Sequence, residues 1–503
     1  MSLRAALFDQ ALSVESLQPW PRIRVDEETW IRAAFGLHAG DVTLLALWGE
    51  PGAVHMGLIE EETGEILVLS LDCPEGRFPS VGVTHAPALR LERTIREMVG
   101  LIPDGCPDDR PWLDHSRWGL THPLGTAEPA PAEGAPYPFL AAEGPPMHQI
   151  PVGPVHAGII EPGHFRFTAN GETVVRLEER LGWVHKGIEG LMIGADVERA
   201  GRIAGRVSGD STVAYGIAFA RAVEAAVGVE APRRAVWLRA LMAEMERIAN
   251  HLGDFGAVCN DASFSVMLSQ CGQLRERVLR AAEAAFGHRL MMDRVVPGGV
   301  AVDLADPKPI AEMVAAIRGV FPRLVQLYDN TASLQNRTVT TGRLDPALAR
   351  RWGAGGHVGR ACGRRFDSRR LPGYAPYDSL RFDVPVREAG DVDARVWIRI
   401  LEIGESLKMV EQILVGCPSG PIRVEVPTAG RAGAEGAALA EAFRGDAFVW
   451  LRLDGEGRIA RAHFRDASVF QWPLLEAAIA YNIVADFPLL NKSFNCSYSG
   501  HDL

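Results

Sequence analysis

Apolar runs of strand length and longer stretches with helical periodicity divide the chain into two parts. Residues that favour strands fill Val42–Trp48 and Glu65–Leu71, and a Thr-Gly step between them suits a turn. Apolar residues then recur at helical spacing over Ala88–Val99. This pattern predicts a small α+β domain over residues 1–120.

The segment 121–148 breaks this periodicity. It is dense in Pro, Ala and Gly. Such a composition favours extended, solvated chain over packed structure. We therefore expect a linker here and a second domain over 149–503.

The second domain begins with a hairpin signal and continues with long helices. His164–Thr168 and Thr173–Leu177 flank Asn170-Gly171, the strongest short-range signal for a β-hairpin. Helical spacing and a second hairpin signal at an Asp-Gly step then predict a mostly α domain with peripheral β-hairpins. The helices are expected after Pro232, over Leu274–Phe286, over Asp391–Val415 and near Pro473–Val484, and the strands over Ala447–Leu453 and Arg458–Phe464.

Composition narrows the class of protein. The 503 residues include 52 Lys and Arg against 63 Asp and Glu, a net charge of −11 that argues against a general nucleic-acid binder. An apolar fraction of 47% and a charged fraction of 23% are typical of a globular protein with a sizeable core. We read no signal peptide and no apolar stretch long enough to be a transmembrane segment, so contact with a membrane would require a partner.

Motif searches exclude several kinds of site. The chain has no GxxxxGK[ST], HExxH or GxSxG sequence. Its seven Cys include no CxxC pair, so a tightly spaced zinc or iron–sulfur signature is absent. We expect reduced thiols, a cytosolic compartment and no iron–sulfur cluster held by this chain.

Short motifs stand in a fixed order through most of the chain. They are Glu92–Glu97, Asp104–Arg110, Val152–His156, Glu161–Arg166, Val184–Glu189, Arg233–Ala235, Glu244–Ile248, Pro297–Val300 and Ala485–Ser493, followed by Cys496. From Val152 onward this set resembles the large subunit of group 4 nickel–iron hydrogenases and its relative, the quinone-site subunit of respiratory complex I. The first two motifs resemble the complex I subunit that is fused upstream in formate-hydrogenlyase-type proteins.

The resemblance implies both a fold and a setting. The fold would be an α+β domain, the linker and a large mostly α domain like that of the hydrogenase large subunit. The protein would be a peripheral subunit on the cytoplasmic face of a membrane-associated, complex-I-like oxidoreductase. A small iron–sulfur subunit would deliver electrons, other peripheral-arm and membrane ion-translocating subunits would complete the complex, and the acceptor would be quinone-like.

The chain departs from the hydrogenase pattern at the metal site. Hydrogenases of this family hold nickel and iron with four Cys in two CxxC motifs, because soft thiolates suit these metals. The first pair falls on Ala204 and Val207, and the second on Cys496 and Ser499. One thiolate cannot replace four, so we expect no nickel–iron centre and no hydrogen chemistry.

Three residues are candidates for catalysis. Glu161 matches the hydrogenase Glu that relays protons, and its alternative is a salt bridge in the hairpin. His164 is either functional or a structural hydrogen-bonding residue. Arg444 matches the Arg over the hydrogenase metal site and could hold an anion or a quinone oxygen, with a surface ion pair to Asp446 as the alternative.

Other residues are candidates for binding the acceptor or remain as remnants of the metal site. His156 in the hairpin and Tyr215 could bind a quinone, although the Tyr position of the complex I family aligns with a glycine ten residues before Tyr215. Cys496 is either a remnant ligand or a buried thiol. Asp210 and Ser211 either supply polar hydrogen bonds or cap the next helix, and we favour the cap.

Three functions follow from these residues. The leading hypothesis is an oxidoreductase subunit that passes electrons from the iron–sulfur partner to a quinone-like acceptor and couples this to ion translocation. The alternative is a non-catalytic scaffold or coupling subunit with a degenerate site. An intact nickel–iron hydrogenase is the third, and stoichiometric nickel would be needed to support it.

Overall fold

An amino-terminal sheet opens the fold. In the computed structural model, which describes residues 12–14, 16–130, 136–158 and 160–503, five strands pair in the order β1-β3-β6-β5-β4. Only β3 and β6 run parallel to each other. The strands are β1 (Leu12–Val14), β3 (Arg22–Val25), β4 (Thr43–Glu50), β5 (Ala53–Ile59) and β6 (Ile66–Asp72).

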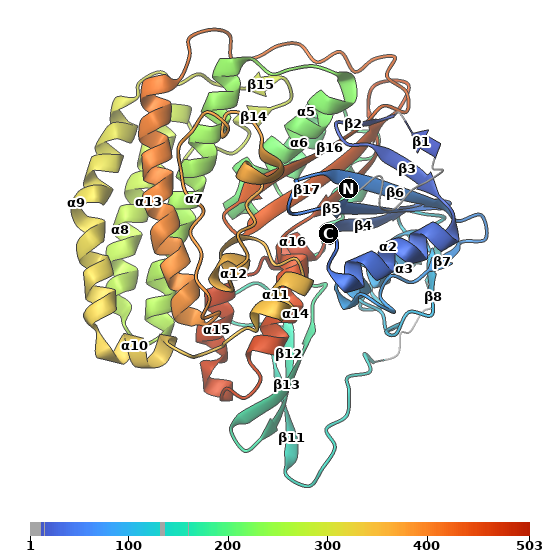
Figure 1. The fold of residues 1–503 in the computed structure, drawn as a ribbon, viewed down its shortest axis with the longest axis horizontal. Helices are drawn as coiled ribbons and strands as arrows, with labels where there is room; N and C mark the ends of the chain where they lie inside the picture. The colour runs from blue at the N-terminus through green and yellow to red at the C-terminus, as the bar shows by residue number, and fades with distance from the viewer. Residues whose placement is uncertain (1–11, 15, 131–135, 159) are drawn as a thin grey trace.

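Two helices pack with this sheet, α2 (Glu27–Ala39) and α3 (Leu89–Val99) (Figure 1). The Asp26 side chain accepts a hydrogen bond from the Thr29 backbone N–H and caps α2, and Gly40 ends it with φ near 84°. Short strand pairs join β7 (Arg77–Pro79) to β8 (Ile102–Asp104) and β9 (Leu120–Thr121) to β10 (Glu128–Pro129).

A three-stranded hairpin sheet projects from the body of the molecule (Figure 1). Its strands are β11 (Met147–Val152), β12 (His164–Asn170) and β13 (Thr173–Arg180), all antiparallel. Gly171 adopts φ near 58° in the turn between β12 and β13, a left-handed conformation that glycine tolerates at no steric cost. The hairpin predicted at Asn170-Gly171 is therefore confirmed.

Long helices form the other side of the molecule. Figure 1 shows α7, α8, α9 and α13 side by side. Each of these helices contacts the next one of the set along the chain, and α13 also contacts α7. The helices between the hairpin sheet and the carboxy-terminal sheet are α4 (Ile188–Met192), α5 (Val197–Ala204), α6 (Thr212–Val227), α7 (Arg233–Asp261), α8 (Ser265–Phe286), α9 (Lys308–Asn330), α10 (Ala332–Thr338), α11 (Pro346–Arg351), α12 (Gly356–Ala361) and α13 (Val392–Gly416), with the short pair β14 (Val295–Val296) and β15 (Gly299–Val300) after α8.

A second sheet joins the two ends of the chain. Strand β2 (Leu17–Gln18) pairs parallel to β16 (Glu435–Ala442), β16 pairs antiparallel to β17 (Gly445–Leu453), and β17 pairs antiparallel to β18 (Ile459–Arg465). Trp48 on β4 packs against Trp450 on β17, with ring centroids 5.5 Å apart. The helices α14 (Ser468–Ala478), α15 (Phe487–Phe494) and α16 (Tyr498–His501) complete the chain.

Most predicted elements are confirmed, with several differences. The helix expected over Leu274–Phe286 already begins at Ser265. Strand β5 lies in the segment that we expected to contain only a turn, where a seven-residue strand pairs with both β4 and β6. The last long helix, expected near Pro473–Val484, instead runs from Ser468 to Ala478, so the proline lies inside it and the helix ends before Val484. Within the described residues, no helix is long and apolar enough to cross a membrane.

Buried ion pairs also join the amino-terminal segment to the carboxy-terminal sheet. The Arg22 guanidinium donates to the Glu435 carboxylate, and the side chains are 8% and 2% exposed. Trp450 Nε1 donates to the same carboxylate at 3.1 Å. Removing one partner of a buried pair leaves the other charge uncompensated.

We expect the variant Glu435→Gln to lower the free energy of unfolding by about 3–5 kcal/mol. The cause would be the Arg22 guanidinium, left buried without its counter-ion. Chemical denaturation of the purified protein measures the change. The control is Glu28→Gln, which removes an exposed partner of Arg32 at 3.7 Å and should change stability by less than about 0.5 kcal/mol. Equal effects of the two variants would contradict the importance of the buried pair.

Candidate functional site

The two segments that align with the hydrogenase CxxC motifs meet in the interior. Ala204 ends α5, Val207 follows it, and both side chains are fully buried. Cys496 and Ser499 lie at the other end of the chain, after α15, and they are also buried. Ser497 Oγ lies 3.3 Å from Ser208 Oγ, so the two segments touch. We call this meeting point the central site, defined by residues 204–211 and 495–499.

An ion pair closes one side of the central site. Arg444 Nη1 and Nη2 donate to the two carboxylate oxygens of Asp210 at 2.8 and 2.7 Å. Arg444 Nε donates to the backbone oxygen of Asn495, so all three guanidinium nitrogens are hydrogen-bonded. Arg444 is only 5% exposed. The alternative of a surface pair between Arg444 and Asp446 is therefore wrong, because Asp446 binds Arg465 instead.

The same geometry corrects the role that we favoured for Asp210 and Ser211. Ser211 is the residue before α6, but its side chain makes no capping hydrogen bond. Asp210 binds Arg444 and accepts from Ser208 Oγ at 2.6 Å. Although burial opposes it, the positive charge of Arg444 keeps the pKa of Asp210 below its ordinary value. Asp210 is thus an ionised partner rather than a helix cap.

Glu161 lies at the edge of the central site and is exposed. Its carboxylate accepts a hydrogen bond from the Ser499 backbone N–H at 3.4 Å. Partial desolvation, together with the negative charge of Asp210, raises its pKa above the ordinary value. A carboxyl group with a raised pKa at the mouth of a buried site can hold and release a proton.

Both hairpin histidines bind the loop that carries Glu161. His156 Nε2 lies 2.7 Å from the Gly163 oxygen, and His164 Nδ1 lies 3.2 Å from the Gly153 oxygen. The His164 ring also packs against Phe139, with centroids 5.1 Å apart. These contacts fix the shape of the loop between β11 and β12.

Tyr215 and Cys496 face the protein interior. The fully buried Tyr215 hydroxyl donates to the Asp466 carboxylate, and burial raises the pKa of the tyrosine well above its ordinary value. The Cys496 thiol points to Gln471 Oε1 at 3.9 Å. Burial also raises the pKa of Cys496 well above that of a free thiol, which favours the neutral form.

Glu246 caps α6 and was missed by the sequence reasoning. Its carboxylate accepts from the Val213 and Ala214 backbone N–H groups at 2.7 and 3.1 Å, at the buried amino-terminal end of the helix. Burial raises the pKa of Glu246 to about 8, and the charge of Asp210 acts in the same direction. The capping residue thus comes from the neighbouring helix α7, 33 positions along the chain.

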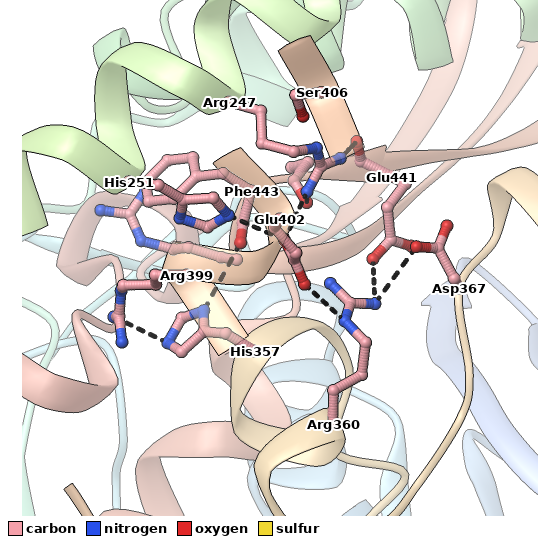
Figure 2. A network of polar contacts seen from close by, with 12 residues as sticks. Arg247, His251, His357, Arg360, Asp367, Arg399, Glu402, Ser406, Glu441 and Phe443 are labelled. Atoms are coloured by element: carbon pink, nitrogen blue, oxygen red, sulfur yellow. Dashed lines mark hydrogen bonds and ion pairs between the residues drawn. The ribbon is translucent and has the colours of Figure 1, made fainter. Parts of the chain in front are cut away.

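Figure 2 shows a second polar group in the core, centred on Glu402 of α13. Glu402 accepts from His251 Nε2 and from Arg360 Nε, each at 2.7 Å. Arg360 also donates to Glu441 at 2.9 Å, and Arg247 lies 3.4 Å from Glu402. We call Arg247, His251, Arg360, Glu402 and Glu441 the core network.

A short chain of contacts links the core network to the central site. Asn495, whose backbone oxygen binds Arg444, donates through its side chain to Asp254 at 2.8 Å. Asp254 accepts from Arg399 Nε at 3.1 Å, and Arg399 Nη2 lies 2.9 Å from His357 Nε2. His357 packs edge-on against His251, with centroids 6.4 Å apart. Charged groups therefore extend from Asp210 into the helical core.

The sequence does contain a signal for this network. Arg395, Arg399, Glu402 and Ser406 follow one another at helical spacing on α13, beside its apolar face, and all four side chains are buried. A charged stripe adjacent to an apolar one requires partners in the core, since unpaired buried charges are costly. The helical spacing of these α13 residues could have predicted a buried polar network, although not the residues of other elements that pair with them.

The residues at the central site do not fit a nickel–iron centre. Of the four positions that would supply thiolates, only Cys496 carries sulfur, and neither Ala204 nor Val207 can ligate a metal. Within the described ranges, no group of three or more His, Cys, Asp or Glu side chains is arranged to hold a metal ion.

Family models match two parts of the chain. Residues 261–435 match the model described as respiratory-chain NADH dehydrogenase, 49 Kd subunit. Residues 186–258 match the model described as nickel-dependent hydrogenase. The two matches lie in the helical half of the protein, which includes α7 and α13 with most of the core network.

Curated relatives cover more of the chain. Formate hydrogenlyase subunit 5 of Escherichia coli is 31% identical over 450 residues, which span 86% of this chain and 78% of that protein. Hydrogenase-4 component G of the same organism is 31% identical and spans 86% and 77%. One subunit of the NADH-quinone oxidoreductase of Anaplasma phagocytophilum is 27% identical and spans 70% and 96%.

A solved structure has the same fold. It is a chain of the membrane-bound sulfane sulfur reductase, an archaeal respiratory membrane complex, with a TM-score of 0.66, 26% identity and coverage of 71% of this chain and 98% of that one. Fold and relatives together define a complex-I-like oxidoreductase subunit of the hydrogenase-large-subunit class. The chain belongs to the family that unites group 4 hydrogenase large subunits with the 49-kDa subunit of complex I.

Titration of Glu246 should make stability depend on pH. In the unfolded chain its carboxyl ionises near the ordinary value of 4.5, whereas the folded protein holds the proton up to about pH 8. The stabilisation is therefore complete at low pH and is lost as pH rises toward 8. We expect Glu246→Gln, which stays neutral, to remove a dependence of up to about 1.4 kcal/mol per pH unit in this window.

Urea unfolding at pH 5.5 and pH 8 measures this difference. The matched control is Glu283→Gln on the exposed side of α8, which should retain the pH dependence of the natural protein. If the Glu246 and Glu283 variants show the same dependence, Glu246 is ionised in the folded state and its assignment fails.

Proposed function

We propose that this protein is a subunit of a membrane-associated, complex-I-like oxidoreductase that works without a nickel–iron centre. The observation that carries the proposal is the replacement of three of the four thiolates by Ala204, Val207 and Ser499. The Asp210–Arg444 pair supports it further, because the Arg444 guanidinium is already committed to a carboxylate and a backbone oxygen.

The proposed partner subunits are inferred from the multisubunit complexes that the names of the relatives indicate. In this proposal a small iron–sulfur protein binds beside the central site and supplies electrons. Other peripheral-arm subunits and membrane ion-translocating subunits complete the assembly on the cytoplasmic face of the membrane. The kinship with formate hydrogenlyase subunit 5 and with a component of NADH-quinone oxidoreductase supports this type of assembly.

The acceptor in the leading form of the proposal is quinone-like. Its reduction takes two electrons from the iron–sulfur partner and two protons from water, and yields the quinol, with ion translocation coupled to this step. Glu161 would pass a proton between solvent and the central site, since it is exposed and its pKa is raised. His156 and His164 would position Glu161 by holding its loop.

The role of Arg444 and Tyr215 in this form is indirect. Arg444 would orient Asp210 and keep it ionised, and one Nη2–H that these bonds leave unused could donate to a quinone oxygen. Tyr215 is bound to Asp466 and would hold that carboxylate in place. Cys496 would be a buried neutral thiol, a remnant of the ancestral ligand set.

A second candidate function is a scaffold or coupling subunit without its own redox chemistry. The observation that favours it is the direct contact between the two segments of the central site, where Ser208 meets Ser497 and Arg444 meets Asn495. Binding of a quinone analogue, followed during redox titration of the complex, distinguishes the candidates. Competitive binding at the central site supports the quinone function, and no binding supports the scaffold.

Metal analysis of the intact complex tests the absence of the nickel–iron centre. We expect iron from the partner subunits, nickel far below one per chain, and no hydrogen uptake in the same sample. The reason is that one thiol cannot supply the sulfur ligands that these metals require. One nickel per chain together with hydrogen uptake would instead identify a working hydrogenase and overturn the proposal.

Substitution of Glu161 tests the proton step. We expect Glu161→Gln to lower quinone reductase activity of the complex by about 10²-fold, because the amide cannot carry a proton. Glu161→Asp should restore part of the activity. The matched control is Glu172→Gln at the exposed tip of the same hairpin, which should leave the rate unchanged. Full activity of Glu161→Gln would remove this residue from the reaction.

A further inference from the structure

A small cavity lies between the amino-terminal sheet and the carboxy-terminal sheet. It offers about 40 Å³ to water-sized molecules, and its wall is mostly apolar. The polar side chains in the wall come from both parts of the protein: Trp48, Arg90, Thr94 and Trp112 from the first, and Glu189, Arg461, His463 and His501 from the second.

Three nitrogen atoms of residues that line this cavity lack a hydrogen-bond partner among the described residues. They are Trp48 Nε1, Arg461 Nε and His463 Nε2. The three residues are 1%, 5% and 8% exposed, so bulk water does not satisfy these atoms. Buried polar atoms in native proteins are nearly always hydrogen-bonded, and exceptions point to something that fills the gap.

The chemistry of the three atoms defines what can fill it. An indole N–H and a guanidinium N–H can only donate. His463 Nδ1 lies 2.9 Å from Glu189 Oε1. Arg461 and His463 keep the pKa of Glu189 at about 2, so this carboxylate is ionised and must accept the Nδ1–H. His463 Nε2 then accepts a hydrogen bond when the ring is neutral and donates one when the ring is charged.

The occupant must accept hydrogen bonds from Trp48 Nε1 and Arg461 Nε, and it must be able to bond with His463 Nε2 in either state of the ring. A halide ion cannot donate, and a metal cation cannot accept. Water does both, and the volume is enough for about three or four molecules, since one molecule needs about 10–15 Å³. We propose that this cavity is a built-in water site, in which ordered water accepts from Trp48 Nε1 and Arg461 Nε and bonds to His463 Nε2.

Such water would join three elements that are distant in sequence. Trp48 lies on β4, Arg461 and His463 lie on β18, and Glu189 of α4 holds both β18 side chains. The Trp48 and His463 rings already stack, with centroids 5.4 Å apart and planes 10° apart. The site is independent of the proposed redox function, because none of its atoms belongs to the central site.

A structure of the intact complex at a resolution that shows ordered solvent tests the proposal directly. We expect a water peak within hydrogen-bonding distance of Trp48 Nε1 and of at least one of the other two atoms. A sample soaked in bromide distinguishes water from an anion by anomalous scattering. An empty cavity, a bromide peak or a cation at this place would overturn the proposal.

A pair of variants tests the proposed water site without a new structure determination. Trp48→Phe and Trp450→Phe remove the same volume from buried positions, but Trp450 Nε1 is bonded to Glu435 within the protein. If water satisfies Trp48, both variants lose a hydrogen bond and should lower Tm by similar amounts. If the cavity is dry, Trp48→Phe removes an unsatisfied donor and should lower Tm clearly less. The second outcome would contradict a water site.

Discussion

Neutralisation of buried charge is the constraint on which the interior of this protein depends. The side chains of Arg247, Arg360 and Arg399 are at most 1% exposed, and each faces at least one carboxylate. Taking such groups out of water costs several kcal/mol per ion, and the cost is offset only where partners are placed with good geometry. Helices α7 and α13 can therefore pack only in the register that brings Arg247 of α7 to Glu402 and Asp254 of α7 to Arg399.

Buried charge is also neutralised in pairs at the central site, which lies nearer the surface than the core network. Where a thiolate cluster would balance its metals, Asp210 and Arg444 balance each other. Asn495 and Asp254 extend the contacts inward to Arg399. A site whose charge is already compensated in this way needs no metal ion to balance it.

Local sequence patterns predict the helices and strands well, but they predict poorly which distant residues contact each other. The Asn-Gly turn, the apolar face of α13 and the start of α7 after Pro232 depend on neighbouring residues, and the structure confirms them. The role of Asp210 depends on Arg444, 234 positions away, so a local pattern could only suggest a helix cap. Strand β5 was missed because its short run precedes an acidic turn. The placement of both CxxC-aligned segments, however, followed from the resemblance.

The pairing of β2 with β16 constrains the order in which the protein can be made. Arg22 and Glu435 meet although 413 positions separate them. At a synthesis rate of about 5–20 residues per second, the first segment waits roughly 20 to 80 seconds for its partner. During this time the apolar face around Trp48 lacks the β17 side chains that cover it. The nascent amino-terminal part is thus a natural client for a chaperone that shields exposed apolar strands.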